Sequence, residues 1–437
     1  MKITPKIVDR DRALILDVVR RFGAISRTDI HHLTHLRMAS ISQLSRELVD
    51  DGKLREGGQG DDSAHVGRKL LSFNEEFGYV VGVDYDAEWT MAAVMDLHPR
   101  IKKPLVKEAT YLNGGVEGLL QQLFACTRRA INGAGVPLTA VLGLGVGDTG
   151  LVDRQQGLSV MSSTIDFWKG VPVQEIFEKE FGIPVVLENN GRTKALAEQL
   201  MGAGQQAPNM IHIEYGKGIG AGVIIEGKLF RGHCSGAGEF GHTHIFENGP
   251  PCKCGSFGCL EALAGIGALE SRMRRAISDG GHSRCLAMAG EDPEKITGWM
   301  VLQAARQGDK MAVTLMDEIG RYLGLGIANL VNLFNPSTIV LDQRLENAGE
   351  RLLDQIKRIV SCQALAHLTE DFQFRFGKLG GEANLLGAGL LILEELFEVP
   401  ALKPPRFVID PTVAPLGRRR RSKRQAQPET AATTMTD

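Results

Sequence analysis

The sequence predicts an α/β protein with a small, mainly helical domain at its amino end. Its 437 residues exceed what one ordinary hydrophobic core supports, so two or three domains are expected. Strand and helix patterns alternate from Tyr79 to about residue 395, which is typical of α/β proteins. Within this region, residues 79–97 and 210–230 share a strand–turn–strand pattern, which indicates an internally duplicated architecture.

The first 75 residues have the pattern of a winged helix-turn-helix domain. Residues 9–22 carry apolar side chains at helical spacing on one face, and Ser26 is a good N-cap for a second, short helix. Residues 39–51 form a third amphipathic helix, and residues 53–73 read as two short strands around a Gly- and Asp-rich tip. Three helices followed by a hairpin favour a DNA-binding domain over residues 1–75.

In such a domain the third helix enters the major groove and the hairpin contacts the backbone or the minor groove. Gln and Arg side chains read adenine and guanine edges, and Arg or Lys on a wing holds phosphates. The DNA-contacting residues predicted on this basis are Arg37, Ser40, Ser42, Gln43 and Arg46 in the helix, with Arg68 and Lys69 in the wing. The alternative is a three-helix domain with a solvated charged face.

Composition limits the classes of function. With 43% hydrophobic and 23% charged residues, the chain has the composition of a soluble globular protein. A net charge of −2 argues against wholesale nucleic-acid or membrane binding, although a local binding surface remains compatible with it. No apolar run approaches the roughly 20 residues that span a bilayer, and the amino end has no signal-peptide pattern. A cytoplasmic protein without membrane insertion is expected.

Three of the seven cysteines are clustered, and their spacing indicates a metal site. Cys252 and Cys254 are too close in sequence to pair comfortably in a disulfide, and the C-x-x-C redox spacing is absent. With Cys259 and His242 they make the one-His, three-Cys set typical of structural Zn²⁺. His244 is a competing ligand, and a loop of buried thiols without a metal is the alternative.

Two glutamates flank this cluster. Glu239 lies just before it and Glu261 just after its last cysteine. Carboxylates fixed beside a metal-bound imidazole can accept hydrogen bonds from a polyol, which points to a sugar site. Each glutamate alone would be read as a surface charge or a helix cap.

These motifs carry a resemblance to a known family. The stretch GAGEFGHTHI…GPPCKCGSFGCLEALAG resembles the signature of the ROK family of repressors, open reading frames and sugar kinases. The similarity runs from the N-terminal helices to LGGEANLLGAGLL, and within the family it is to sugar-responsive regulators such as xylose or N-acetylglucosamine repressors. It implies an actin-like, two-lobed α/β fold of duplicated ribonuclease H-like units, with a sugar bound between the lobes.

The resemblance also implies lobe boundaries and residue roles. A small lobe would span residues 79–190, completed by a C-terminal helix at about 384–400, and a large lobe with the zinc site would span 191–383. The implied zinc ligands are His242, Cys252, Cys254 and Cys259. The implied sugar contacts are Asn189, Asn190, Glu239, His242 and Glu261.

The chain departs from the family's kinases at four places. The phosphate turn Asp-x-Gly-Gly-Thr is replaced by Asp84–Glu88, which puts carboxylates where phosphate should lie. The second phosphate turn reads Gly216–Gly218 with a lysine between, and a glycine cluster on the adenosine side is replaced by Asp342–Arg344. Asn190 stands where the kinases have the catalytic Asp, and an amide cannot act as that general base. We therefore expect no catalytic residues, no ATP and no enzyme.

Three functional hypotheses follow. The first is a sugar-responsive transcriptional regulator of carbohydrate metabolism genes, a repressor that binds double-stranded operator DNA and a sugar or phosphosugar effector as a homodimer or homotetramer. The second is an active ATP-dependent sugar kinase with an added DNA-binding domain. The third is a regulator whose input is a protein partner.

The last 27 residues, 411–437, have almost no large apolar side chains and are predicted to be disordered. The run Arg418–Arg421 makes this tail basic. It would either add salt-dependent affinity for DNA or be a solvated end, and we favour the solvated end.

Overall fold

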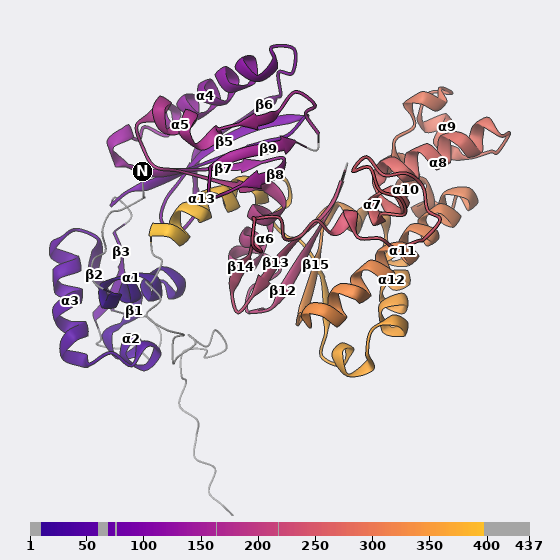
Figure 1. The fold of residues 1–437 in the computed structure, drawn as a ribbon. Helices are drawn as coiled ribbons and strands as arrows, with labels where there is room; N and C mark the ends of the chain where they lie inside the picture. Colours follow the sequence, from indigo (N-terminus) through magenta and orange to yellow (C-terminus); the bar gives the residue numbers. More distant parts are fainter. Residues whose placement is uncertain (1–9, 60–68, 75–76, 163, 217, 397–437) are drawn as a thin grey trace, which may run out of the picture.

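The computed structural model describes residues 10–59, 69–74, 77–162, 164–216 and 218–396. In this part of the chain a small N-terminal unit lies beside two larger units, each built around a five-stranded sheet (Figure 1). The predicted tail at 411–437 and the wing tip with Arg68 lie outside the described residues.

The N-terminal unit contains the three predicted helices and the predicted hairpin. Its sheet has the order β1-β3-β2, with antiparallel pairing throughout. The Ser26 hydroxyl accepts a hydrogen bond from the Asp29 amide (3.2 Å) and so caps the second helix as expected. The elements are α1 (Arg10–Phe22), β1 (Ile25–Ser26), α2 (Arg27–Thr34), α3 (Met38–Asp50), β2 (Leu54–Gln59) and β3 (Lys69–Phe73).

The first large sheet has the order β11-β7-β4-β5-β6. Its strands are β4 (Tyr79–Tyr85), β5 (Trp89–Met95), β6 (Ile101–Ala109), β7 (Val141–Asp148) and β11 (Val185–Asn189). Helices α4 (Gly115–Gly133) and α5 (Val173–Phe181) share one apolar core with this sheet. A second, three-stranded sheet is formed by β8 (Gly150–Asp153), β9 (Leu158–Ser162) and β10 (Lys169–Val171).

The last described helix, α13 (Ala383–Leu396), returns to the first sheet and packs on β4 and β7. The approach is close enough that only glycine fits at Gly145, where a Cβ would lie 1.8 Å from the Ala388 carbonyl oxygen. The core on this face is continuous with the N-terminal unit, because buried residues of α1, α3 and α13 belong to one cluster. Helix α13 therefore contacts both the sheet and the N-terminal unit.

The second large sheet has the order β14-β13-β12-β15-β16. Its strands are β12 (Met210–Tyr215), β13 (Ile219–Ile225), β14 (Lys228–Phe230), β15 (Thr338–Leu341) and β16 (Gln373–Phe376). The helices of this half are α6 (Asn190–Met201), α7 (Leu260–Ala264), α8 (Ile266–Ser278), α9 (Arg284–Met288), α10 (Gly298–Arg306), α11 (Lys310–Phe334) and α12 (Glu350–Gln363). Short 3₁₀ turns are η1 (Leu138–Ala140), η2 (Phe240–His242), η3 (Pro293–Lys295), η4 (Gln343–Ala348), η5 (Ala366–Thr369) and η6 (Gly380–Glu382).

The predicted duplication is confirmed by the strand pairing. In each large sheet, three consecutive strands form an antiparallel meander, and two later strands add in parallel beside the first of them. Helix α6 packs on β12 and β13 of the second sheet and also on α13, so it lies between the two halves (Figure 1). The β11–α6 junction at residues 188–190 is therefore placed where the halves meet.

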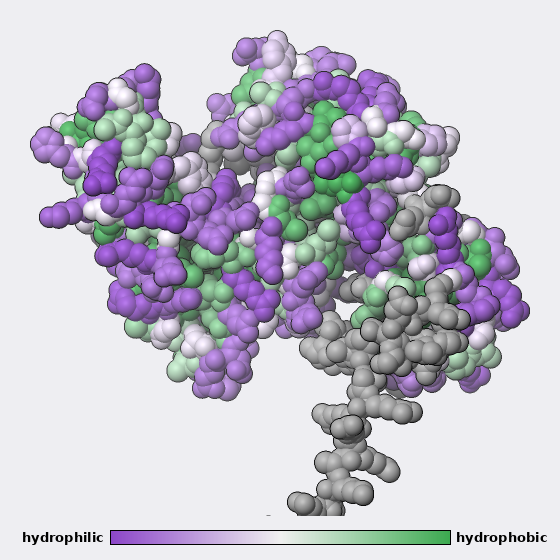
Figure 2. Space-filling model, turned by 180° about the vertical axis from the view of Figure 1, so that it is seen from behind, coloured by the Kyte–Doolittle hydropathy of each residue, from purple (hydrophilic) through white to green (hydrophobic). Residues whose placement is uncertain are grey.

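Seen from behind, the surface is mostly hydrophilic, with hydrophobic residues in scattered patches (Figure 2). Among the helices that the structure describes, none is both long and apolar enough to cross a bilayer.

Candidate functional site

The four predicted metal ligands converge. Ligand atoms of His242, Cys252, Cys254 and Cys259 all lie within 4.8 Å of one another. The Cys254 and Cys259 sulfurs are 3.7 Å apart, well beyond the roughly 2.05 Å of a disulfide. The Cys252 sulfur lies 3.6 Å from Nδ1 of His242.

These two distances fit a tetrahedral zinc ion. Bonds of about 2.3 Å to sulfur and about 2.05 Å to nitrogen put two sulfurs about 3.8 Å apart, and a sulfur and a nitrogen about 3.6 Å apart. The observed 3.7 Å and 3.6 Å match both edges. Burial and the neighbouring thiols raise the pKa of Cys259 to about 12.

The loop that carries the ligands is tightly folded. The Cys252 amide donates to the Ser256 carbonyl (2.8 Å), and Pro251 and Phe257 form an isolated β-bridge. Gly258 has a φ of +66°, and a Cβ there would lie 1.9 Å from the Phe246 carbonyl oxygen, so the turn requires glycine. The competing ligand, His244, stands apart from the cluster, with its Nδ1 2.9 Å from the Phe257 carbonyl oxygen.

The two flanking glutamates differ in their surroundings. Glu261 is the second residue of α7, and its Oε2 accepts a hydrogen bond from the Ile219 amide (3.0 Å), which ties it to the start of β13. Glu239 is exposed at the beginning of η2. Within the described residues, no hydrogen bond joins either carboxylate to the side chain of Asn189 or Asn190.

The two asparagines are also unequal. The Asn189 side chain caps α6, since its Oδ1 accepts from the Arg192 amide (3.2 Å) and its Nδ2 donates to the Gly150 carbonyl (2.7 Å). The partly buried Asn190 side chain has no hydrogen bond to any part of the chain that the structure describes. Asn190 is therefore the freer of the two to bind a ligand.

Sequence reasoning missed a charged cluster beside these asparagines. Glu188 is fully buried at the end of β11 and contacts three arginines. Arg192 Nε lies 2.6 Å from its Oε1, while Arg231 Nε and Arg154 Nη1 lie 2.8 Å and 3.4 Å from its Oε2. Burial opposes ionisation of Glu188, but the three guanidinium groups outweigh it and its pKa lies below the ordinary value. The sequence signal for this cluster is a single glutamate near the end of an otherwise apolar strand.

The cluster joins the two halves of the molecule. Arg231 directly follows β14, and Arg192 Nη1 donates to the Ala237 carbonyl (3.0 Å). The segment that leads to Glu239 and His242 is thereby attached to the β11–α6 junction. The structure thus brings the predicted sugar-contacting segments side by side.

A second charged network surrounds Asp342, which follows β15. Asp342 pairs with Arg344 through two parallel hydrogen bonds (2.9 and 2.8 Å), and Lys194 donates to Glu214 (3.0 Å) and to Asp342 (3.3 Å). The Arg344 guanidinium lies 5.5 Å from the centre of the Trp299 ring.

The guanidinium of Arg344 also lies against the turn after β12. A Cβ placed on Gly216 would be 3.1 Å from both of its terminal nitrogens. The chain's own arginine therefore fills the space beside this turn. Lys194, Glu214 and Trp299 were not singled out from the sequence, because their partners are distant in the chain.

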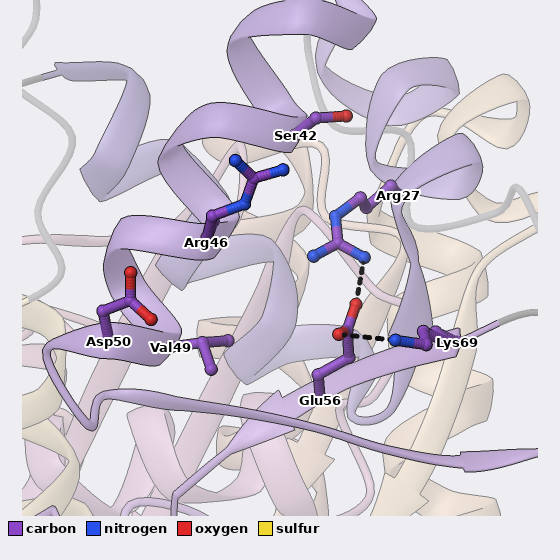
Figure 3. A pocket seen from close by; sticks show the side chains of 7 residues that line it. All are labelled: Arg27, Ser42, Arg46, Val49, Asp50, Glu56 and Lys69. Atoms are coloured by element: carbon purple, nitrogen blue, oxygen red, sulfur yellow. Dashed lines mark hydrogen bonds and ion pairs between the residues drawn. The ribbon is translucent and has the colours of Figure 1, made fainter.

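Of the residues predicted in the DNA-reading helix, Arg37 lies just before α3 as its N-cap residue. Arg37, Gln43 and Arg46 are exposed to solvent, and Ser40 and Ser42 are half-buried. A groove of about 520 Å³ lies between α3 and the β2–β3 hairpin (Figure 3). It is lined by Arg27, Ser42, Arg46, Val49, Asp50, Glu56 and Lys69.

Within this groove, Glu56 neutralises two of the cations. It forms an ion pair with Arg27 and accepts from Lys69 (3.2 Å), as the dashed lines in Figure 3 show. The hydrogen bond from Arg27 holds the pKa of Glu56 below its ordinary value. Arg46 points into the groove with no such partner drawn among the labelled residues.

Three comparisons with known proteins agree with this architecture. The xylose repressor of Caldicellulosiruptor bescii is 28% identical over 392 residues, which cover 89% of this chain and 97% of the repressor. A solved ROK family transcriptional regulator, a homologue of the E. coli MLC protein, has a TM-score of 0.78 at 27% identity and covers 90% of this chain and 98% of its own. A ROK family glucokinase from Streptomyces griseus, solved with glucose and AMPPNP, has a TM-score of 0.62 at 33% identity and covers 72% of this chain and 99% of its own.

The family model described as the ROK family matches residues 81–395, well over half of the chain. Together with two large sheets of identical topology on either side of α6, this match identifies the actin-like, two-lobed fold. The chain belongs to the ROK family.

Proposed function

We propose that this protein is a sugar-responsive, DNA-binding transcriptional repressor of carbohydrate metabolism genes, without kinase activity. One observation carries the proposal: a three-helix unit with a β-hairpin precedes the family domain. The match to the xylose repressor covers 89% of the chain, whereas the match to the glucokinase covers 72%.

In this proposal the N-terminal unit is a winged helix-turn-helix domain. Helix α3 enters the major groove with Arg37, Ser40, Ser42, Gln43 and Arg46, and Lys69 and Arg68 of the wing contact phosphates. A dimer would present two such units to the two halves of an operator.

The proposed sugar site lies between the β11–α6 junction and residues 242–259, the loop that carries the predicted zinc ligands and is called the zinc loop below. Asn190, Glu239, His242 and Glu261 would hydrogen-bond the sugar hydroxyls, while Asn189 would act chiefly by capping α6. Zinc bound by His242 and the three cysteines of the loop would fix Glu261 and Glu239 relative to β13. The domain limits of this proposal are the ones expected from the sequence, at residues 75, 190 and 383.

Kinase activity is disfavoured by the chemistry of the site. Asn190 has no basic group to accept a proton from a sugar hydroxyl. Arg344 lies against the turn after β12, and Asp342 and Glu214 add negative charge beside it. A nucleotide phosphate would have to compete with Asp342 for Arg344, and with Glu214 and Asp342 for Lys194.

The experiment is a fluorescence anisotropy titration of the full chain against DNA from upstream of its own gene, at fixed salt. A scrambled duplex and the variant Arg46→Ala serve as controls. We expect binding at least 100-fold tighter than to the scrambled duplex, and a loss of about 10-fold in Arg46→Ala, because a good base contact contributes about 1–3 kcal/mol.

A parallel coupled assay for ADP release with D-glucose and D-xylose tests the kinase alternative. Sugar-dependent turnover combined with equal affinity for both duplexes would refute the repressor proposal and favour the sugar kinase.

A further inference from the structure

Helix α13 carries two adjacent glutamates whose partners lie in different parts of the molecule. Glu394 pairs with Arg20 of α1 (2.7 Å), and Glu395 pairs with Arg154, which follows β8. Neighbouring residues of a helix point about 100° apart, so the pair can contact two separate structures at once. In Figure 1, α13 runs from the first sheet toward the N-terminal unit.

On one side, the contacts lead to the proposed sugar site. Arg154 also lies 3.4 Å from Glu188, the buried carboxylate next to Asn189 and Asn190. Glu188 is shared with Arg231, at the start of the segment that carries Glu239. The charge around Glu188 therefore depends on where that segment lies.

On the other side, the contacts lead to the DNA-reading helix. The Arg20 side chain is buried. Besides Glu394 of α13, it pairs with Asp17 (2.9 Å), which lies in α1 like Arg20 itself. Near the opposite end of α1, Arg12 forms an ion pair with Glu47 of α3, and Glu47 accepts from Gln43 (3.0 Å). The path ends at one of the residues proposed to read bases.

We propose that α13 couples the effector site to the DNA-binding unit through its two glutamates, an inference that rests on the repressor function proposed above. A sugar that draws the segment after β14 toward Asn190 shifts Arg231 relative to Glu188. Arg154 is then redistributed between Glu188 and Glu395, because a buried carboxylate that loses a partner is strongly destabilised.

The change is passed on because Glu394 and Glu395 share one turn of a rigid helix. A displacement of α13 at Glu395 moves the partner of Arg20 and hence α1. By linkage, DNA bound to α3 must affect sugar affinity by the same factor.

The test uses the full chain with Glu395→Gln, Glu394→Gln and the double variant. Glu382→Gln is the matched control, since Glu382 is exposed just before α13 and makes no side-chain hydrogen bond within the described residues. Hydrogen–deuterium exchange of residues 10–22 is measured without ligand. Operator affinity is then measured with and without D-xylose, D-glucose and N-acetylglucosamine, added one at a time.

We expect Glu395→Gln to speed exchange in α1 at least 3-fold, although its own partner lies outside the N-terminal unit. We also expect it to reduce the sugar-induced change in operator affinity at least 3-fold, and the double variant to add little further. Glu382→Gln should match the wild type in both measurements. If Glu395→Gln does not fold, Glu395→Asp keeps the charge while shortening its reach and serves in its place.

Unchanged exchange in α1 with an unchanged sugar response, whatever the melting temperature, would overturn the coupling. A wild type that does not distinguish operator from scrambled DNA would instead refute the repressor function. The α1 exchange of Glu395→Gln still decides in that case whether α13 links the two regions.

Discussion

Asp84 is a carboxyl group that the fold buries in surroundings that disfavour its ionised form. It is 5% exposed at the end of β4, and its Oδ1 has no hydrogen-bond partner among the described residues. Burial raises its pKa to about 8, and the neighbouring carboxylates of Asp86 and Glu214 add to this more than Lys194 offsets it. Asp84 is therefore mostly protonated at neutral pH.

This predicts a pH-dependent stability. Between about pH 4 and pH 8, the unfolded chain ionises Asp84 while the folded chain keeps its proton, so the free energy of unfolding falls as pH rises. Between about pH 6.5 and pH 8 the loss is at most about 2 kcal/mol, at roughly 1.4 kcal/mol per pH unit. Asp84→Asn mimics the protonated group and should remove this decline.

The measurement is urea unfolding of wild type and Asp84→Asn at both pH values. Asp148, whose pKa burial raises to about 6, is present in both proteins, so its titration contributes equally to both declines. An equal decline in both proteins would show that Asp84 is already ionised at pH 6.5.

A second prediction at the residue scale concerns Glu56 and DNA binding. Because it neutralises Arg27 and Lys69 in the groove beside α3, Glu56→Gln should free two cations for phosphate contacts. Affinity for both operator and scrambled DNA should rise about 3-fold, and the dependence on salt should steepen by up to about two units. Anisotropy titrations at several salt concentrations, with Glu382→Gln as control, measure both. Weaker binding by Glu56→Gln would mean that Glu56 positions these cations for DNA.

At the scale of elements, the zinc loop and the β11–α6 junction depend on different interactions. The loop has few buried apolar side chains, since Phe246 and Phe257 are 48% and 59% exposed. Its shape must therefore depend on the ligand cluster and the few backbone hydrogen bonds. The junction is held by a helix cap and by the ion pairs of Glu188.

Cys254→Ser should release zinc and loosen the segments that carry Glu239 and Glu261, because three ligands do not close a tetrahedral structural site. The N-terminal unit should stay folded and bind DNA. Atomic absorption measures the metal, and Cys362→Ser, which removes an exposed cysteine outside the cluster, is the matched control. Full zinc retention in Cys254→Ser would contradict the ligand assignment.

The two asparagines of the junction should separate stability from ligand binding. Asn189→Ala removes the cap of α6 and should cost about 1 kcal/mol of unfolding free energy. Asn190→Ala should change stability by less than about 0.5 kcal/mol while abolishing the effect of sugar on DNA binding. Urea unfolding and anisotropy test the pair, and the opposite distribution of the two effects would refute a capping Asn189 and a ligand-binding Asn190.

At the scale of the whole molecule, local patterns were predictable and long-range pairs were not. The helices of the N-terminal unit, the duplicated strand pattern and the cysteine spacing are each contained in short stretches of sequence. The ion pairs of Arg154 with Glu395 and of Arg20 with Glu394 join residues 241 and 374 positions apart, so no local pattern signals them. The arginine cluster around Glu188 and the contacts of Arg344 depend on how the two sheets are arranged in space, so the sequence alone does not indicate them.

A sugar-responsive repressor requires that sugar and DNA bind one molecule at coupled sites. The decisive measurement is operator affinity by anisotropy, with D-xylose, D-glucose and N-acetylglucosamine added singly to the wild type and to Asn190→Ala. We expect at least one sugar to change the operator Kd 10-fold or more in the wild type, and Asn190→Ala to lose this change while still binding DNA. Sugar-dependent ADP release from a wild type that binds operator no better than scrambled DNA would contradict the repressor function.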